Sequence, residues 1–458
     1  MQNKVARLMY AKTNGPTLEA FSIENHLLRI ADFTTLNPRK VAARLELFQS
    51  PTRLNIMFLN ESEFNEIPDQ GYVGGGFIND SKLVEVLERA GMTGTHAKRA
   101  VAIQVRIFIP SIGVFKGMLM RKRHTVGAPI ELPWEMKKVL KSLHPEPLPG
   151  AHLVICKNGV FPSPGSANEY IGRKLDPNLK APPEKSFQAK IKKPLTKMIF
   201  RVWQTMGVSE ELCQKYAKES IKPEFRNHAW LVGVPDPTDR LPPDTIFVPG
   251  MKTIQPTELF VTRSPCYAYE HGRKLSTVTQ KPESMPDEDW NWLNDQLNFG
   301  VIIFSNPRSG MKSIPERIAN GDLDGDLYLV CWDENILNSM KACPLSDEIS
   351  DDNNNNGKLS TGDSNPNWLK DAQDIMIDAS VNNGIGRLTG ILYRMAEKIA
   401  DNSDLTLRHP DANACYEAYN SCLEFAKHGR DIILPGHLIE KIPANLRSLL
   451  KSSNENPD

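Results

Sequence analysis

The sequence lacks the cysteine pattern of a zinc site or a disulfide framework. Its 458 residues include 7 cysteines, which is an odd number, and no two of them are spaced as Cys-x-x-Cys. Structural zinc sites and disulfide scaffolds depend on such paired spacings. Cys266 and Cys331 lie in apolar or motif-like surroundings, and we expect them to be ordinary core thiols.

Long apolar runs are also missing. No stretch approaches the ~20 apolar residues that a membrane-spanning helix needs. The first residues, 1–7, lack the apolar core of a signal peptide. We therefore expect an intracellular protein, in the cytoplasm or the nucleus, that has no membrane contact.

The chain carries no excess of charge of either sign. Its 55 Lys and Arg balance 55 Asp and Glu, so the formal net charge is +0. Basic clusters nevertheless lie in the first half, at 121–124 and 190–197, and acid-rich stretches lie in the second, at 283–295 and 347–352. A channel that holds a polyanion can be basic while the whole molecule is neutral, although a charge run is more often a solvated face.

Three aspartates stand at every second position directly ahead of an apolar run. They are Asp322, Asp324 and Asp326, and residues 327–332 indicate a buried strand. Alternate side chains of an extended chain leave on the same side, so the three carboxylates are expected to point together. At about 4 Å each pair costs ~4 kcal/mol at an effective dielectric constant of about 20. Such a cluster persists most easily around a cation, and oxygen ligands favour Mg²⁺ where phosphates share the coordination.

Two other interpretations of this stretch fit less well. Asp and Gly together most often mark a solvated turn, but here the apolar run anchors the aspartates against a core. A calcium loop of the EF-hand kind needs Gly at its sixth position. Counted from Asp322 that position is Leu327, and no helix signal follows.

The string Ala-Asn-Gly-Asp-Leu-Asp-Gly-Asp-Leu-Tyr, residues 319–328, closely resembles the catalytic aspartate loop of cellular RNA-dependent RNA polymerases of the RNA-silencing type. It is also similar to the loop in the large subunit of DNA-dependent RNA polymerases. Residues 38–50 (Pro-x-Lys-Val-Ala-Ala-Arg-Leu-x-Leu-Phe-x-Ser) are similar to the family's segment ahead of its first barrel. They also indicate a helix, capped by Asn37 with Pro38 at its first position.

Further segments resemble the same family in the same order. Residues 72–120 contain a glycine turn, a helix, a Gln-x-Arg strand and a Lys-Gly strand. Residues 133–138 stand where the family has Pro-Ser-Met-x-Lys, and 262–266 are similar to its Thr-Arg-Asn-Pro-Cys. The glycine turn lacks the family's usual Asp, and the spacing from Arg106 to Lys116 is longer than usual.

The resemblance implies a mixed α/β (α+β) fold in which two double-psi β-barrels form a catalytic cleft, with flanking helices and a C-terminal helical head. The stretch 145–183, rich in Pro, Gly, Ser and Asn, indicates a long loop or linker. The expected domains are an N-terminal helical or linker segment over 1–70, a first barrel over 71–190, connecting helices over 191–225, a second barrel over 226–340, a disordered loop over 341–370 and the head over 371–458.

The resemblance also implies roles for individual residues. Asp322, Asp324 and Asp326 would be catalytic and would hold Mg²⁺. Five basic residues would face the nucleotide phosphates and the RNA: Arg106, Lys116, Lys138, Arg263 and Lys427. Arg106, Lys116 and Lys138 have a plainer interpretation as surface charge, and Lys427, near the end of a helix, can simply satisfy the helix dipole.

The implied function is RNA-dependent synthesis of complementary RNA, giving double-stranded RNA for RNA silencing, by nucleotidyl transfer with two metal ions about 3.5–4 Å apart. Its partners would be template RNA, the nascent RNA strand, NTPs and other RNA-silencing proteins. Two alternatives stay open: a non-catalytic RNA-binding or scaffold remnant of such a polymerase, and a DNA-templated polymerase or primase. The resemblance does not reach the long N-terminal region usual in these polymerases, so we expect either a minimal form or a fragment.

Overall fold

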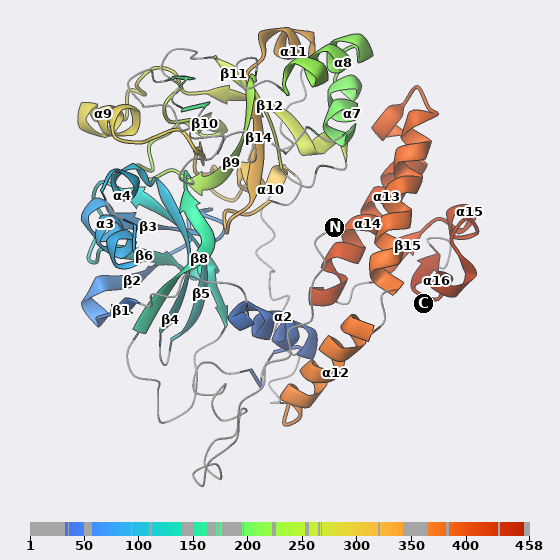
Figure 1. Ribbon diagram of the computed structural model, residues 1–458, viewed down its shortest axis with the longest axis horizontal. Helices are drawn as coiled ribbons and strands as arrows, with labels where there is room; N and C mark the ends of the chain where they lie inside the picture. Colours follow the sequence, from blue (N-terminus) through green and yellow to red (C-terminus); the bar gives the residue numbers. More distant parts are fainter. Residues whose placement is uncertain are drawn as a thin grey trace.

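Two strand-rich units and a helical unit make up the described part of the protein (Figure 1). The computed structural model describes residues 33–34, 36–49, 57–92, 94–109, 112–139, 151–162, 171–172, 174–175, 195, 197–221, 226–251, 256–263, 266, 268–318, 321–341, 365–381, 384–428 and 431–452. The fold is therefore mixed α/β, as the sequence predicts. No helix in these ranges is both long and apolar enough to cross a membrane.

The first strand unit is an eight-stranded sheet in the order β1-β8-β4-β5-β3-β6-β2, with β7 paired to β5. Helices α3 (Asp80–Arg89) and α4 (Thr95–Arg99) cover one side of it (Figure 1). Apolar side chains of α3 and of β4 share one buried cluster with those of β8. The strands are β1 (Met57–Leu59), β2 (Phe64–Ile67), β3 (Gly75–Asn79), β4 (Ala102–Ile109), β5 (Gly113–Lys122), β6 (Ile130–Pro133), β7 (Lys137–Val139) and β8 (Ala151–Phe161).

Strand β8 shows that the prediction of a loop over 145–183 is wrong for residues 151–161. The 11 residues of β8 pair antiparallel with β1 and β4. Pro and Gly dominate the composition of the longer stretch, but Leu153, Ile155 and Val160 within it are buried in the sheet core. Pairing with strands distant in the sequence therefore decides the conformation here. Residues 140–150, 163–170 and 176–194 of the neighbourhood lie outside the described part.

The second strand unit is a closed barrel in the order β10-β12-β11-β14-β9-β13. Strand β13 closes it by pairing parallel with β9 and antiparallel with β10. The strand predicted over 327–332 is confirmed as β14. The barrel strands are β9 (His228–Pro235), β10 (Thr245–Phe247), β11 (Glu258–Arg263), β12 (Gly272–Thr277), β13 (Val301–Phe304) and β14 (Leu327–Cys331), and helices α9 (Asp287–Asp295), α10 (Ile314–Arg317) and α11 (Glu334–Ser339) flank them.

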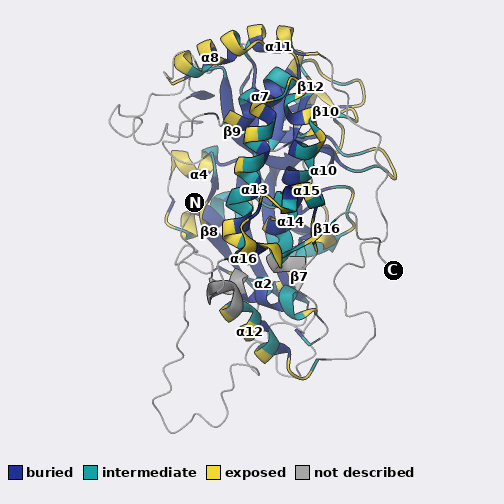
Figure 2. Ribbon diagram, turned by 90° about the vertical axis from the view of Figure 1, so that its right-hand side faces the viewer, coloured by how far each residue is buried: buried dark blue, intermediate teal, exposed yellow. Residues whose placement is uncertain are grey.

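The helical regions agree with the periodicity of the sequence. The predicted helix pair after residue 194 is α7 (Lys197–Thr205) and α8 (Glu210–Glu219), whose inner face is buried while α8 is exposed along its outer side (Figure 2). The C-terminal region contains α12 (Trp368–Val381), α13 (Gly384–Asp401), α14 (Pro410–His428), α15 (Gly436–Ile439) and α16 (Ala444–Arg447), with β15 (Ile432–Leu434) paired to β16 (Leu450–Ser452). One buried cluster joins α7 to α13 and α14. The predicted disordered loop falls mainly on 342–364, outside the described residues.

Helix α2 (Pro38–Gln49) lies between the first strand unit and the helical unit (Figure 1). It begins as predicted, since the side chain of Asn37 accepts a hydrogen bond from the Arg39 amide at 3.0 Å. Its residues Val41 and Leu45 pack with Val114 of β5 and Trp368 of α12. An N-terminal helix thus contacts both the strand core and the head.

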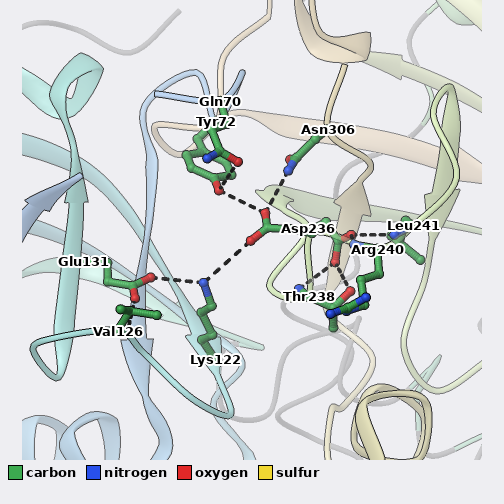
Figure 3. Close-up of polar contacts among 11 residues, drawn as sticks. Gln70, Tyr72, Lys122, Val126, Glu131, Asp236, Thr238, Arg240, Leu241 and Asn306 are labelled. Carbon is green, nitrogen blue, oxygen red and sulfur yellow. Dashed lines mark hydrogen bonds and ion pairs between the residues drawn. The ribbon is translucent and has the colours of Figure 1, made fainter. Parts of the chain in front are cut away.

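Polar contacts around Asp239 fasten the two strand units together (Figure 3). The hydroxyl of Tyr72 donates to Asp239 Oδ1 at 2.9 Å, and the amide of Asn306 donates to the same oxygen at 2.8 Å. Lys122 Nζ lies 3.1 Å from Glu131 and 3.8 Å from Asp239. Burial, and then the charge of Asp239, raises the pKa of Tyr72, so this phenol stays protonated and remains a donor.

We expect Tyr72→Phe to lower the free energy of unfolding by about 1 kcal/mol, because it removes one hydrogen bond of a buried side chain. Asp239→Ala should cost more, since it also leaves Asn306 without its acceptor. The two variants share one hydrogen bond, so the double variant should lose less than the sum of the single losses. Denaturant titration of the four proteins measures this, and strictly additive losses would contradict the contact.

Candidate active site

The three aspartates stand on a short loop between α10 and β14. Helix α10 begins with a capping box, in which the Glu316 side chain accepts from the Ser313 amide at 2.8 Å. The chain then turns back, and the Gly321 amide donates to the Pro315 carbonyl at 2.9 Å. The loop itself is bent rather than extended. The alternation argument of the sequence is therefore wrong about the cause, because the turn and not a strand brings the side chains together.

Gly325 makes this bend possible. Its φ is 129°, which side-chain-bearing residues rarely adopt. A Cβ at this position would also overlap the side-chain amide of Gln104. Glycine is thus required both for the backbone conformation and for the close approach of the first strand unit.

The structure brings the carboxylates of Asp322, Asp324 and Asp326 to one point. Each offers an oxygen, and the three oxygens all lie within 4.8 Å of one another. The side chains of Asp324 and Asp326 are only 16% and 20% exposed. This is an oxygen-only donor set at a spacing that one hard divalent cation could bridge.

Hydrogen bonds inside the barrel hold the loop in this shape. Asp326 Oδ2 accepts from the Asp322 amide at 3.3 Å, and the Asp326 carbonyl accepts from the Gly233 amide at 3.1 Å. The Tyr328 hydroxyl donates to the Asp322 carbonyl at 3.1 Å. Burial, followed by the charge of Asp326, raises the pKa of Tyr328 well above its ordinary value, so the phenol remains a neutral donor.

The first strand unit forms hydrogen bonds with the same loop from the other side. The Leu323 amide donates to the Val73 carbonyl at 2.7 Å, and Gln104 Nε2 donates to the Asp324 carbonyl at 2.8 Å. Val73 has a φ of 46°, an unfavourable value for a β-branched residue. It occupies the glycine turn in which the family's usual Asp is missing. Gln104 was not predicted to be a site residue, although the Gln-x-Arg pattern drew attention to its strand.

Two of the predicted basic residues contact the aspartates directly. Lys116 Nζ, on β5, lies 2.6 Å from Asp324 Oδ2. Arg263 Nε, at the end of β11, lies 2.5 Å from Asp326 Oδ2. Burial lowers the pKa of Arg263, but the attraction of Asp326 more than reverses this, so the net shift is upward and the guanidinium stays charged.

The other three predicted basic residues, Arg106, Lys138 and Lys427, belong to different elements of the fold. Arg106, on β4, is directly opposite Lys116 in the strand register and is 5% exposed. Lys138 belongs to β7 and Lys427 to the last turn of α14, and the side chains of both lie outside the described part.

Near Arg263, burial and then the charges of Arg263 and Arg273 lower the pKa of His271 to about 3, so its imidazole adds no positive charge at neutral pH.

The family model for RNA dependent RNA polymerase matches residues 2–171 and 179–456 of this chain. The chain belongs to the RNA dependent RNA polymerase family. The family resemblance seen in its motifs is thereby confirmed. The match spans the glycine turn, the Lys116 strand and the aspartate loop, which the structure brings into contact.

Two RNA-dependent RNA polymerases from plants resemble the chain over part of its length. The chain is 23% identical over 198 residues to RNA-dependent RNA polymerase 1 of Arabidopsis thaliana, a match that covers 42% of this chain and 15% of that protein. It is 24% identical over 176 residues to the probable RNA-dependent RNA polymerase 2 of Oryza sativa subsp. japonica, covering 38% of this chain and 13% of that protein.

Among solved structures, the chain is similar in fold to the RNA dependent RNA polymerase QDE-1 from Thielavia terrestris, with a TM-score of 0.54 and 16% sequence identity. The match covers 94% of this chain and 53% of that one. The chain therefore spans about half the length of this solved relative, and it matches a smaller share of the curated ones.

We expect Gly325→Ala to reduce stability by about 1–3 kcal/mol, because it forces a side chain into a backbone region that favours glycine. Displacement of Gln104 should loosen the loop further. Gly390→Ala is the matched control, since a Cβ at this helical glycine would meet only Arg394 Nη1, at an ordinary contact distance of 3.7 Å, and alanine there should stabilise by about 0.5–1 kcal/mol. Thermal unfolding of both variants tests this, and equal melting temperatures would contradict the role given to Gly325.

Proposed function

We propose that this chain catalyses RNA-templated synthesis of RNA from NTPs. The observation that carries the proposal is the meeting of three carboxylate oxygens within 4.8 Å of one another, on a loop that two strand units hold. Lys116 and Arg263 face two of these carboxylates from opposite units. Membership of the polymerase family supports the same activity.

We also propose that the strand units are the two double-psi barrels that the resemblance implies. The closed second unit supports this, as does the mixture of parallel and antiparallel pairs in both units. In the proposed organisation the first barrel also includes β1 and β2, which lie ahead of the limit at residue 71 expected from the sequence. The cleft between the barrels would then contain the aspartate loop on one side and the face of β4 and β5 that bears Arg106 and Lys116 on the other.

The residues present fit Mg²⁺. Asp322, Asp324 and Asp326 would hold it, because their donor set consists of oxygen alone. When bound, Mg²⁺ would supply the positive charge that activates a primer 3′-hydroxyl and neutralises the pyrophosphate leaving group. Lys116 and Arg263 are the chain's own counter-charges to the same carboxylates, and they keep the loop folded through the ion pairs described above.

The basic residues would position phosphate groups. Arg106 and Lys116 stand side by side on β4 and β5, and the guanidinium of Arg263 remains charged at any physiological pH. Phosphoryl-type transfer depends mainly on such placement and electrostatic stabilisation. Lys138 and Lys427 are proposed for the same work on the resemblance alone.

Template RNA, the nascent strand and NTPs are the partners that this activity needs, and its double-stranded product would serve RNA silencing together with other silencing proteins. Primer extension with labelled NTPs, Mg²⁺ and matched RNA and DNA templates is the direct test. We expect incorporation that depends on the RNA template. Absence of incorporation would favour a non-catalytic RNA-binding protein, and incorporation on DNA alone would favour a DNA-templated enzyme.

We expect Asp326→Asn to reduce incorporation by more than about 100-fold, beyond the effect typical of residues that only support a metal ligand. The amide keeps the shape and one acceptor oxygen but removes the charge. RNA affinity, measured by fluorescence anisotropy, should stay near the wild-type value, because the phosphates are expected to meet the basic residues.

The matched control for this prediction is Asp287→Asn, which removes a carboxylate that is 80% exposed on α9. Its incorporation rate should equal that of the wild type. Substantial polymerisation by Asp326→Asn would contradict the role of the aspartate cluster.

A further inference from the structure

Helix α2 brings a cation of the N-terminal segment to the catalytic face. Its apolar residues Val41 and Leu45 share one buried cluster with Val114 of β5. Val114 stands two residues before Lys116 on the same strand, so both side chains leave on the same side of the sheet. Arg44 immediately precedes Leu45, so it belongs to the turn of α2 that joins this cluster.

The electrostatic surroundings of Arg44 agree with this placement. Its side chain is partly buried, and burial lowers the pKa of its guanidinium while the charge of Asp324 opposes that shift. Arg44 and Asp324 are 280 residues apart in the chain, yet they are close enough in space to interact. The helix thus reaches the neighbourhood of the aspartate loop.

The pKa of Cys156 responds to charges in the same region. Cys156 of β8 is buried, and although burial raises the pKa of its thiol, the charges of Arg106 and Lys116 oppose the shift and that of Asp324 adds to it. Strand β8 lies beside β4, where Val154 is opposite Arg106 in the register. The face formed by β8, β4 and β5 therefore carries Arg106 and Lys116 toward Asp324, the same carboxylate whose charge acts on Arg44 of α2.

Within the residues that the structure describes, nothing accepts from the donors of Arg44. Within the described part of the chain it forms no hydrogen bond or ion pair. A guanidinium carries five N–H donors in a fixed planar arrangement that matches phosphate oxygens. Placing such a group in a partly buried position is unfavourable unless an anion compensates it, and Asp324 already has its close partner in Lys116.

We propose that Arg44 is a phosphate-binding residue of the cleft, extending the row formed by Arg106 and Lys116. The ligand class is a phosphate group of a nucleotide, which could belong either to the incoming NTP or to the backbone of an RNA strand. The inference rests on the proposed function for its context, but binding measurements test it independently of catalysis.

The test compares Arg44→Gln with Arg44→Lys and with Arg39→Gln as the matched control. Arg39 is on the same helix, but its guanidinium lies 4.8 Å from the ring centre of Phe425 on α14, toward the head. Affinities are measured by fluorescence anisotropy for a labelled single-stranded RNA and for a fluorescent NTP, at several salt concentrations. Thermal unfolding shows that each variant is folded.

We expect Arg44→Gln to lower the binding affinity for one of the two ligands about tenfold, which corresponds to ~1.4 kcal/mol. If RNA supplies the phosphate, the negative slope of log affinity against log salt concentration should also become shallower by about 0.7. If the NTP supplies it, the affinity for the NTP should fall and the slope for RNA should not change. Arg44→Lys should recover part of the loss, and Arg39→Gln should bind both ligands as the wild type does.

Unchanged affinity for both ligands in folded Arg44→Gln would overturn the inference, as would an equal loss in Arg39→Gln. If Arg44→Gln unfolds at too low a temperature to be compared, folded Arg44→Lys is used instead. Equal affinities of Arg44→Lys and the wild type for both ligands, with equal salt slopes, would also overturn the inference. A wild-type protein that binds RNA but incorporates no NTP would refute the proposed activity and leave this result to stand on its own.

Discussion

Mutual repulsion of three carboxylates is the constraint on which the rest of this structure depends. At a separation of 4.8 Å each pair of unit charges repels by about 3.5 kcal/mol at an effective dielectric constant of about 20. The fold opposes this repulsion with two close cations, Lys116 and Arg263, which come from different strand units. The arrangement is stable as a protein and still offers three oxygens toward one point.

The aspartate loop is consequently a shared element of two units. The second unit supplies the chain itself, together with the donors Gly233 and Tyr328. The first unit supplies an acceptor at Val73 and a donor at Gln104. Small residues allow the approach, since a Cβ at Gly74 would stand 3.2 Å from Asp324 Cβ. The contacts around Asp239 hold the same two units together away from the loop, so the geometry of the site depends on a joint between units.

Much of this organisation could be predicted from the sequence, because its signals are local. The cap of α2, the strand that follows the aspartates and the order of the motifs each depend on residues that are neighbours in the sequence. The spacing of the aspartates predicted their convergence, but for the wrong reason, since Gly325 bends the loop. Strand β8 was missed because its pairing partners are distant and its flanks are rich in Pro and Gly. Gln104 was missed because its partner, the Asp324 carbonyl, is a backbone atom 220 residues away.

Binding of Mn²⁺, measured by electron paramagnetic resonance in the wild type and in Asp324→Asn, tests the central claim most directly. Removal of one of the three converging charges should lower the affinity for a divalent ion, because that affinity depends on the charge of the ligands. The account predicts Mn²⁺ binding by the wild type that Mg²⁺ displaces, and a large loss of that binding in the variant. Equal Mn²⁺ binding by the two proteins would contradict it.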